Sequence, residues 1–268
     1  MKTTLDLRER PLPAAVSAVD TDEYQKVVID TEAVEHDEEL VDLATFGIKT
    51  ASFYGDKTGL NAPVNRPFRS GLTNVYARTS VAKMLVEVNK LLAEYGVAVV
   101  VIDGYRPISV QTELWFWMVE QAQKQLPNGT EADWHAFALR YASNPGNFKS
   151  SDSSTWPTHA TGGAVDLSLE EIGTGKPLFM GSIYLDSTEL SSTRHFESAS
   201  DCGSASHVEA KWNRRLLYWA MSSVGFVNYP FEWWHFDYLT QASVMNRGFP
   251  EGAVAHYGLA LEGESPEA

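Results

Sequence analysis

The feature that most restricts the fold of this sequence is a short stretch in which a histidine and an aspartate flank a pair of glycines. It runs from Thr158 to Leu169 and reads T-H-A-T-G-G-A-V-D-L-S-L. After the glycines, apolar and other residues alternate, which predicts a strand with valine and leucine side chains on one face and Asp166 on the other. The glycine pair can take positive φ and turn the chain. We therefore expect His159 to fold back onto the polar face of this strand, beside Asp166.

A second stretch supplies another histidine and a further carboxylate. It runs from Phe231 to Tyr238, reads F-E-W-W-H-F-D-Y, and has the aromatic character of a buried or cleft-lining strand. Residues three apart point to opposite faces of a regular strand, which would separate Glu232 from His235. We therefore expect Glu232 to lie in the turn before the strand or at a bulge. The Tyr-Pro pair just upstream can form such a turn.

Together the two stretches contain the residues of a catalytic zinc site. Zinc in hydrolases usually takes three ligands from His, Asp or Glu and leaves a fourth position to a water whose pKa falls towards about 7. We predict that one zinc ion per chain is held by His159, Asp166 and His235, with Glu232 as the base beside the water. A single histidine is more often a hydrogen-bonded structural residue than a ligand, and the alternative ligand that we consider is His195.

Three segments, in their order and spacing, resemble the zinc D-alanyl-D-alanine dipeptidases associated with vancomycin resistance, which belong with the wider zinc D,D-peptidases. They are D-G-Y-R-P from Asp103, H-A-T-G-G-A-V-D from His159 and E-W-W-H from Glu232. The likeness extends between these segments and covers roughly Asp42 to Tyr238. It implies the same three zinc ligands and an α+β fold.

The resemblance also implies roles for two further residues. Glu232 would act as general base and then as general acid, and Arg106 would bind and polarise the carbonyl oxygen of the scissile amide. A guanidinium aimed at the developing oxyanion stabilises the transition state more than the ground state. The alternative for Arg106 is a structural salt bridge with Asp103. Its place in a turn just after a predicted strand favours catalysis, because catalytic residues often lie on such loops.

The sequence departs from this family at positions around the substrate. Relatives commonly carry serines just before the first zinc histidine, where this chain has Pro157 and Thr158. An acidic residue after an M-G-x segment holds the substrate's amino group in the dipeptidases, and Asp186 is the nearest match here. In the family an N-terminal tyrosine helps to shape the substrate pocket, and the corresponding region of this chain offers only Phe46 or Tyr54. We expect the zinc chemistry to be retained, and the exact dipeptide stays open.

Composition is that of a globular protein and argues against other classes. The 268 residues are 44% hydrophobic, which is enough for a real core. The 35 acidic and 21 basic residues give a net charge of −14, which argues against a nucleic-acid partner. The single cysteine, Cys202, cannot form an internal disulfide, and the predicted set of zinc ligands is complete without it.

No secretory signal or run of roughly 20 apolar residues is present, so we expect no membrane span and a cytoplasmic location. The sequence does not indicate an oligomeric state.

The chain divides into three parts. Residues 1–40 are expected to form a partly ordered extension, residues 41–260 the catalytic domain, and residues 261–268 an acidic tail. Within the domain, the polar loop 144–156 is a candidate lid over the site.

Apolar periodicity predicts the main elements. Helices are expected over 80–95, 109–126, 133–141 and 208–224, and strands over 26–29, 97–102, 164–169 and 178–185. Ser80 and a Ser206–Glu209 capping box are expected to start the first and last helices. In the last helix Trp212 is expected to be buried and Arg214 to be solvated. The predicted fold is α+β, in which a small, mostly antiparallel sheet carries the ligands on one face and helices pack on the other.

The predicted function is zinc-dependent hydrolysis of a short peptide, and the resemblance implies D-alanyl-D-alanine as the substrate. The alternative enzyme is a D,D-carboxypeptidase that acts on cell-wall peptides. The lack of an export signal speaks against it, because that substrate lies outside the cytoplasm. The alternative outside the enzymes is a non-catalytic zinc-binding module, which would need neither Glu232 nor Arg106.

Overall fold

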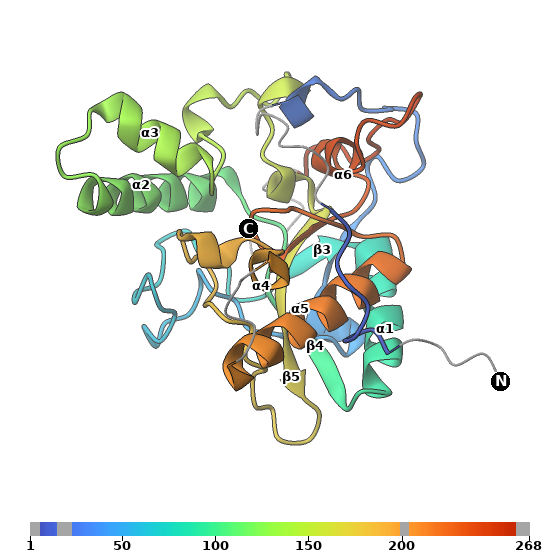
Figure 1. Cartoon of the computed structure of the whole chain (residues 1–268). Helices are drawn as coiled ribbons and strands as arrows, with labels where there is room; N and C mark the ends of the chain where they lie inside the picture. Colours follow the sequence, from blue (N-terminus) through green and yellow to red (C-terminus); the bar gives the residue numbers. More distant parts are fainter. Residues whose placement is uncertain (1–5, 15–22, 199–203, 261–268) are drawn as a thin grey trace.

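A five-stranded sheet forms the centre of the molecule (Figure 1). The computed structural model describes residues 6–14, 23–198 and 204–260. In spatial order the strands are β2 (Lys49–Thr50), β4 (Val97–Asp103), β5 (Ala164–Glu171), β7 (His235–Asp237) and β6 (Val227–Asn228). The β2–β4 pair is parallel and the other pairs are antiparallel. The predicted small, mostly antiparallel sheet is therefore confirmed. A second sheet pairs β1 (Leu40–Asp42) with β3 (Tyr76–Arg78).

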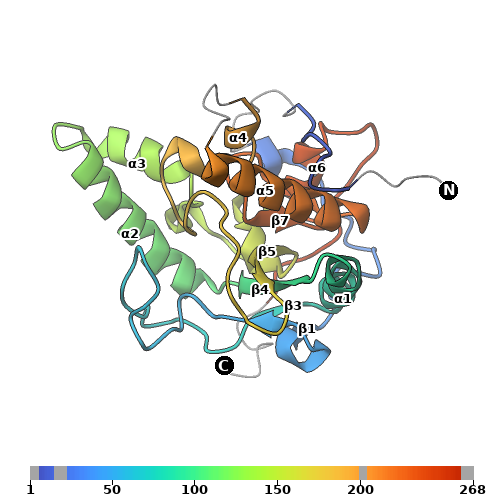
Figure 2. The same cartoon turned by 60° about the horizontal axis from the view of Figure 1, so that its bottom comes forward.

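Two long helices cover one face of the central sheet. They are α1 (Thr79–Ala93) and α5 (Ala205–Ser223), which pack on β4, on β5 and on each other (Figures 1 and 2). A hairpin of α2 (Ile108–Gln125) and α3 (Glu131–Leu139) projects to one side. Two short helices, α4 (His195–Ser198) and α6 (Gln241–Asn246), complete the described set. The predicted α+β arrangement is confirmed, and none of these helices combines the length and apolar character needed to cross a membrane. A cytoplasmic location stays a prediction.

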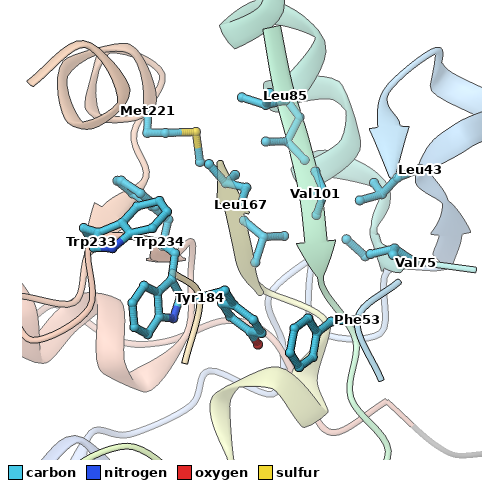
Figure 3. Close-up of a cluster of buried hydrophobic side chains, with 14 of the residues drawn as sticks. Leu43, Phe53, Val75, Leu85, Val101, Leu167, Tyr184, Met221, Trp233 and Trp234 are labelled. Carbon is cyan, nitrogen blue, oxygen red and sulfur yellow. The ribbon is translucent and has the colours of Figure 1, made fainter. Parts of the chain in front are cut away.

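The core lies between the sheet and the two covering helices. Val101 of β4 and Leu167 of β5 face Leu85 of α1 and Met221 of α5, and all four side chains are fully buried (Figure 3). Strand alternation turns Asp166 to the opposite face. The helices therefore hold the apolar face of β5 in place and leave its polar face for the functional site.

The predicted strand over 178–185 is wrong. The segment follows turns with positive φ at Gly181 (87°) and Leu185 (59°), which extended pairing does not allow. The carbonyls of Met180, Leu190 and Ser192 accept hydrogen bonds from the buried guanidinium of Arg214 instead. The expected solvation of Arg214 is therefore also wrong. Its guanidinium donates hydrogen bonds to carbonyls of an irregular loop, which in a sheet would be bonded to a neighbouring strand.

Other expected elements are shifted. The cap of α5 is Ser204, whose side chain accepts the His207 N–H, so the helix starts before the expected capping box. Trp212 is 45% exposed, because the buried stripe lies one position further along the helix. Ser80 lies inside α1, and its hydroxyl donates to Glu38.

The described part of the N-terminal extension packs against the rest of the chain. A 3-10 helix at Glu23–Lys26 and a single bridge from Ile29 to Ala255 replace the strand expected over 26–29. The guanidinium of Arg10 lies 3.4 Å from the Trp219 ring centroid. Cys202 and the acidic tail lie outside the described residues. The division into three parts stays a prediction.

Candidate metal centre and its pocket

Strand register brings polar side chains of three strands into one row. Asp103 of β4 lies opposite Asp166 of β5, which lies opposite His235 of β7. The first pairing depends on a register shift between Val101 and Asp103, since regular pairing would place Asp103 one position away. The row crosses the centre of the sheet at the end of β4.

His159 reaches this row from a tight turn. A 3-10 helix at Thr158–Thr161 ends at Gly162, whose φ is 74° and whose Cα lies so close to Leu40 that a Cβ would come within 2.5 Å of its Cδ2. Only glycine fits this turn. His159 Nδ1 lies 2.8 Å from the carbonyl oxygen of Gly104, so Nδ1 donates there and Nε2 faces Asp166 and His235. The predicted return of His159 onto the strand is confirmed.

The three predicted ligands form a compact group whose donor atoms all lie within 4.8 Å of one another, and all three side chains are buried. His235 Nδ1 lies 3.2 Å from His159 Nε2 and 3.0 Å from Asp166 Oδ1. Two imidazole nitrogens and one carboxylate oxygen are the donor set of a catalytic zinc site. In the described residues this is the one such group of His, Cys, Asp and Glu. The residues present therefore fit a metal ion.

Carboxylates around His235 strengthen this fit. Its Nε2 lies 2.9 Å from Oδ2 of the fully buried Asp237, which orients the ring so that Nδ1 points at the metal position. Burial alone would lower the pKa of His235, but Asp237 and Asp166 raise this pKa well above its usual value. The two aspartates thus surround the imidazole with negative charge, which stabilises its protonated form. The same negative charge would attract a divalent cation in place of that proton.

Two tyrosines fix the orientation of Asp166. Tyr184 donates a hydrogen bond of 2.8 Å to Asp166 Oδ2, and its oxygen lies 3.0 Å from that of Tyr54. The same Oδ2 accepts from Arg106 Nη2 at 3.2 Å. With Oδ2 occupied, Oδ1 remains for the metal, beside His235.

Replacement of Tyr184 by phenylalanine should weaken metal binding. The variant Tyr184→Phe removes one of the two groups that hold Asp166 Oδ2, and the loss of such a supporting hydrogen bond typically lowers metal affinity about 10-fold to 100-fold. Competition with a chromophoric chelator measures this affinity. The control is Tyr54→Phe, which touches Asp166 only through Tyr184 and should have a smaller effect. Equal affinity in wild type and Tyr184→Phe would contradict the assigned support.

Glu232 lies in a turn before β7, as predicted. Its backbone N–H donates to Tyr229 O, and its carbonyl accepts from the Asn228 amide. Glu232 Oε2 lies 4.0 Å from His235 Nδ1, on the same side of the sheet. Burial, with a further contribution from Asp166, raises the pKa of Glu232 to about 8, although His235 and Arg106 oppose this shift. A carboxyl with a pKa near neutrality can both accept and return a proton.

Arg106 is buried and multiply bonded. Nε and Nη2 contact Asp103 Oδ2 at 2.7 and 2.6 Å, and Nη1 donates to Gln111 at 2.9 Å. The salt bridge with Asp103, considered above as an alternative to catalysis, is therefore present. It does not exclude catalysis, because Arg106 also lines the pocket and Nη1 carries a second hydrogen.

A pocket of about 90 Å³ adjoins these residues. It is lined by all three candidate ligands, by Glu232 and Arg106, and by an apolar wall that includes Leu114, Leu139, Leu185 and Met245. One water needs roughly 10–15 Å³ on the same scale. The pocket therefore has room for several waters, or for a ligand of about dipeptide size.

Several residues that the sequence suggested lie outside this pocket. The Asp186 carboxylate accepts the Thr188 N–H, and its neighbour Leu185 occupies the pocket wall. His195 starts α4 beside Phe196 and takes no part in the metal group, so the alternative ligand is wrong. Phe46 and Tyr54 do not line the pocket, nor does any residue of loop 144–156. Roles for Asp186 in substrate binding and for the loop as a lid stay predictions.

Several contributing residues were not predicted. Asp237 could have been found, because it lies two residues after His235 and so shares its face of the strand. Tyr24 and Arg140 also line the pocket. They come from the extension and from the end of α3, and no local pattern relates them to the metal ligands.

Two histidines and an aspartate beside a pocket with a further buried carboxylate form the kind of site that metal-dependent hydrolases use. A sequence profile described as D-Ala-D-Ala dipeptidase matches residues 71–255. The chain therefore belongs to the D-Ala-D-Ala dipeptidase family.

Two relatives with the same named activity agree with this assignment. The chain is similar to a D-alanyl-D-alanine dipeptidase of Synechocystis, with 30% identity over 68% of this chain and 77% of the relative. It is 29% identical to the corresponding protein of Enterococcus faecalis over 63% of this chain and 76% of that one. A solved vancomycin-resistance D,D-pentapeptidase, VanY, in complex with Zn(II) matches 87% of this chain and 97% of its own at 15% identity and a TM-score of 0.43.

Proposed function

We propose that this protein hydrolyses D-alanyl-D-alanine, or a closely related short D,D-dipeptide, with one zinc ion held by His159, Asp166 and His235. The observation that carries the proposal is the placement of Glu232 and Arg106 on the same pocket as this metal group. Membership of the dipeptidase family supports the substrate. A non-catalytic metal module would need neither of these two pocket residues.

A zinc ion at this position would act as a Lewis acid towards water and the amide carbonyl. Glu232 takes a proton from the attacking water and returns it to the nitrogen of the leaving amino acid. In the metal-free chain, burial raises the pKa of Glu232 to about 8, and a cation at the neighbouring metal position would lower this pKa, so that the carboxylate is available as a base near neutral pH. Arg106, held by Asp103 and Gln111, presents Nη1 to the oxygen that becomes negative during attack.

The proposal is tested by release of free D-alanine from D-alanyl-D-alanine by the purified, zinc-loaded protein. Chelated protein and L-alanyl-L-alanine serve as controls, and elemental analysis reports the zinc content of each sample. We expect chelator-sensitive turnover of the D,D form and one zinc per chain. Bound zinc without turnover of any D,D-dipeptide would refute the proposed reaction. Appreciable turnover of a pentapeptide stem would favour the D,D-carboxypeptidase alternative.

Replacement of Arg106 by lysine should reduce turnover strongly. The variant Arg106→Lys keeps the charge but loses the planar fork that contacts Asp103 and Gln111 together. Loss of one donor to the oxyanion typically lowers kcat about 10²-fold to 10³-fold, while KM should change less. Steady-state kinetics measures both, with circular dichroism and zinc content as controls. A variant with bound zinc and wild-type kcat would contradict the catalytic role and leave Arg106 as a structural ion-pair partner.

A further inference from the structure

The charged residues of the pocket fall into two groups. Arg106, Asp166, Glu232 and Asp237 belong with the histidines of the metal centre. The remaining charged residue in the described lining is Arg140, at the C-terminal end of α3. The pocket wall beyond the metal centre is therefore apolar or neutral, apart from one guanidinium.

Arg140 is only loosely held within the protein. Its Nη2 lies 3.6 Å from Glu189 Oε1, and the two side chains are 50% and 83% exposed. Ion pairs with this exposure contribute little to stability and exchange easily with other partners. Arg106, by contrast, already contacts Asp103, Asp166 and Gln111. An anionic group that enters the pocket thus finds Arg140 as the cation that can rearrange to meet it.

The pocket connects Arg140 with the metal centre, and Tyr229 lines it beside His235. The Tyr229 ring centroid lies 5.9 Å from that of His235. Glu232 and Arg140 line this pocket as well, so the metal group and Arg140 open onto one cavity.

A cation on the same pocket as the metal group suits the chemistry of a peptide substrate. The terminal carboxylate of a dipeptide lies one residue beyond the scissile carbonyl, about 3.5 Å of extended chain. The planar guanidinium of arginine can bind such a carboxylate through two parallel hydrogen bonds.

We propose that Arg140 binds the C-terminal carboxylate of the peptide substrate and thereby selects peptides with a free C-terminus. This inference rests on the proposed function, because it needs the scissile amide to lie at the metal centre. Glu189 then acts as an internal competitor that occupies Arg140 until substrate arrives.

The test compares D-alanyl-D-alanine with its C-terminal amide in the zinc-loaded protein. With Arg140→Gln, KM for the free acid should rise about 10-fold or more, in line with a lost hydrogen bond between charged groups. The value of kcat should change little, because the contact is equal in the ground and transition states. KM for the amide should stay within about twofold of wild type. The matched control is Lys124→Gln, which removes one exposed positive charge outside the pocket.

A second variant acts in the opposite direction. Glu189→Gln removes the competing carboxylate and should lower KM for the free acid by about two- to threefold, as expected for an exposed ion pair. An unchanged KM for the acid in Arg140→Gln, or equal effects on acid and amide, would overturn the inference while the proposed function stands. If the wild type turns over neither compound, the proposed function fails, and the carboxylate assignment fails with it.

Discussion

The variant Glu232→Gln should lose about 10²-fold to 10⁴-fold in kcat while it keeps its zinc. Glutamine has nearly the same shape but cannot accept the proton of the attacking water. Zinc should remain because the three donor atoms come from other residues. Steady-state assays of D-alanine release measure the fall in kcat, and elemental analysis measures the zinc content.

The same variant gives a second readout that does not depend on turnover. Burial raises the pKa of Glu232 from 4.5 to about 8 in the metal-free chain, so the folded state holds a proton that the unfolded state releases. The free energy of unfolding should therefore fall as pH rises from about 4.5 to 8. Urea unfolding of metal-free Glu232→Gln should show a flatter pH dependence than wild type over this window. Wild-type turnover would contradict the role of Glu232 as general base, and an unchanged pH slope would contradict its raised pKa.

The metal group could be predicted from sequence because its spacing restricts the backbone. Only glycine fits the turn after His159, and strand alternation alone places Asp166 away from the apolar core. The spacing of Glu232 and His235 excludes one regular strand, and this incompatibility correctly predicts a turn. In each case the prediction depends on a local geometric rule.

The sequence could not predict contacts that depend on distant parts of the chain. The strand expected over 178–185 has suitable residues, but Asn213 and Arg214 of α5 donate to the Phe179 and Met180 carbonyls. Tyr184 lies in this loop and reaches Asp166 only because the loop is held in this way. Arg140 likewise meets the pocket through the packing of the α2–α3 hairpin. A side chain that bonds to the backbone of a distant loop, or that reaches the pocket from a distant helix, produces no periodic pattern in the sequence.

The variant His235→Ala should lose the metal. It removes one of three donor atoms, and since loss of a supporting residue alone typically costs 10-fold to 100-fold in affinity, we expect at least about a 100-fold loss here. Competition with a chromophoric chelator measures the affinity. The matched control is His195→Ala, which removes a histidine outside the metal group and should leave the affinity unchanged.

Thermal unfolding separates loss of metal from damage to the fold. Zinc at 100 times its Kd stabilises the folded state by about 2.7 kcal/mol, which in a chain of this size corresponds to roughly 5–10 °C in Tm. Wild type and His195→Ala should show this increase in Tm on addition of zinc, and His235→Ala should not. The metal-free variant will also differ from wild type, because Asp166 and Asp237 lose the imidazole between them. The comparison is therefore made between the zinc-dependent increments, and a wild-type increment in His235→Ala would place the metal elsewhere.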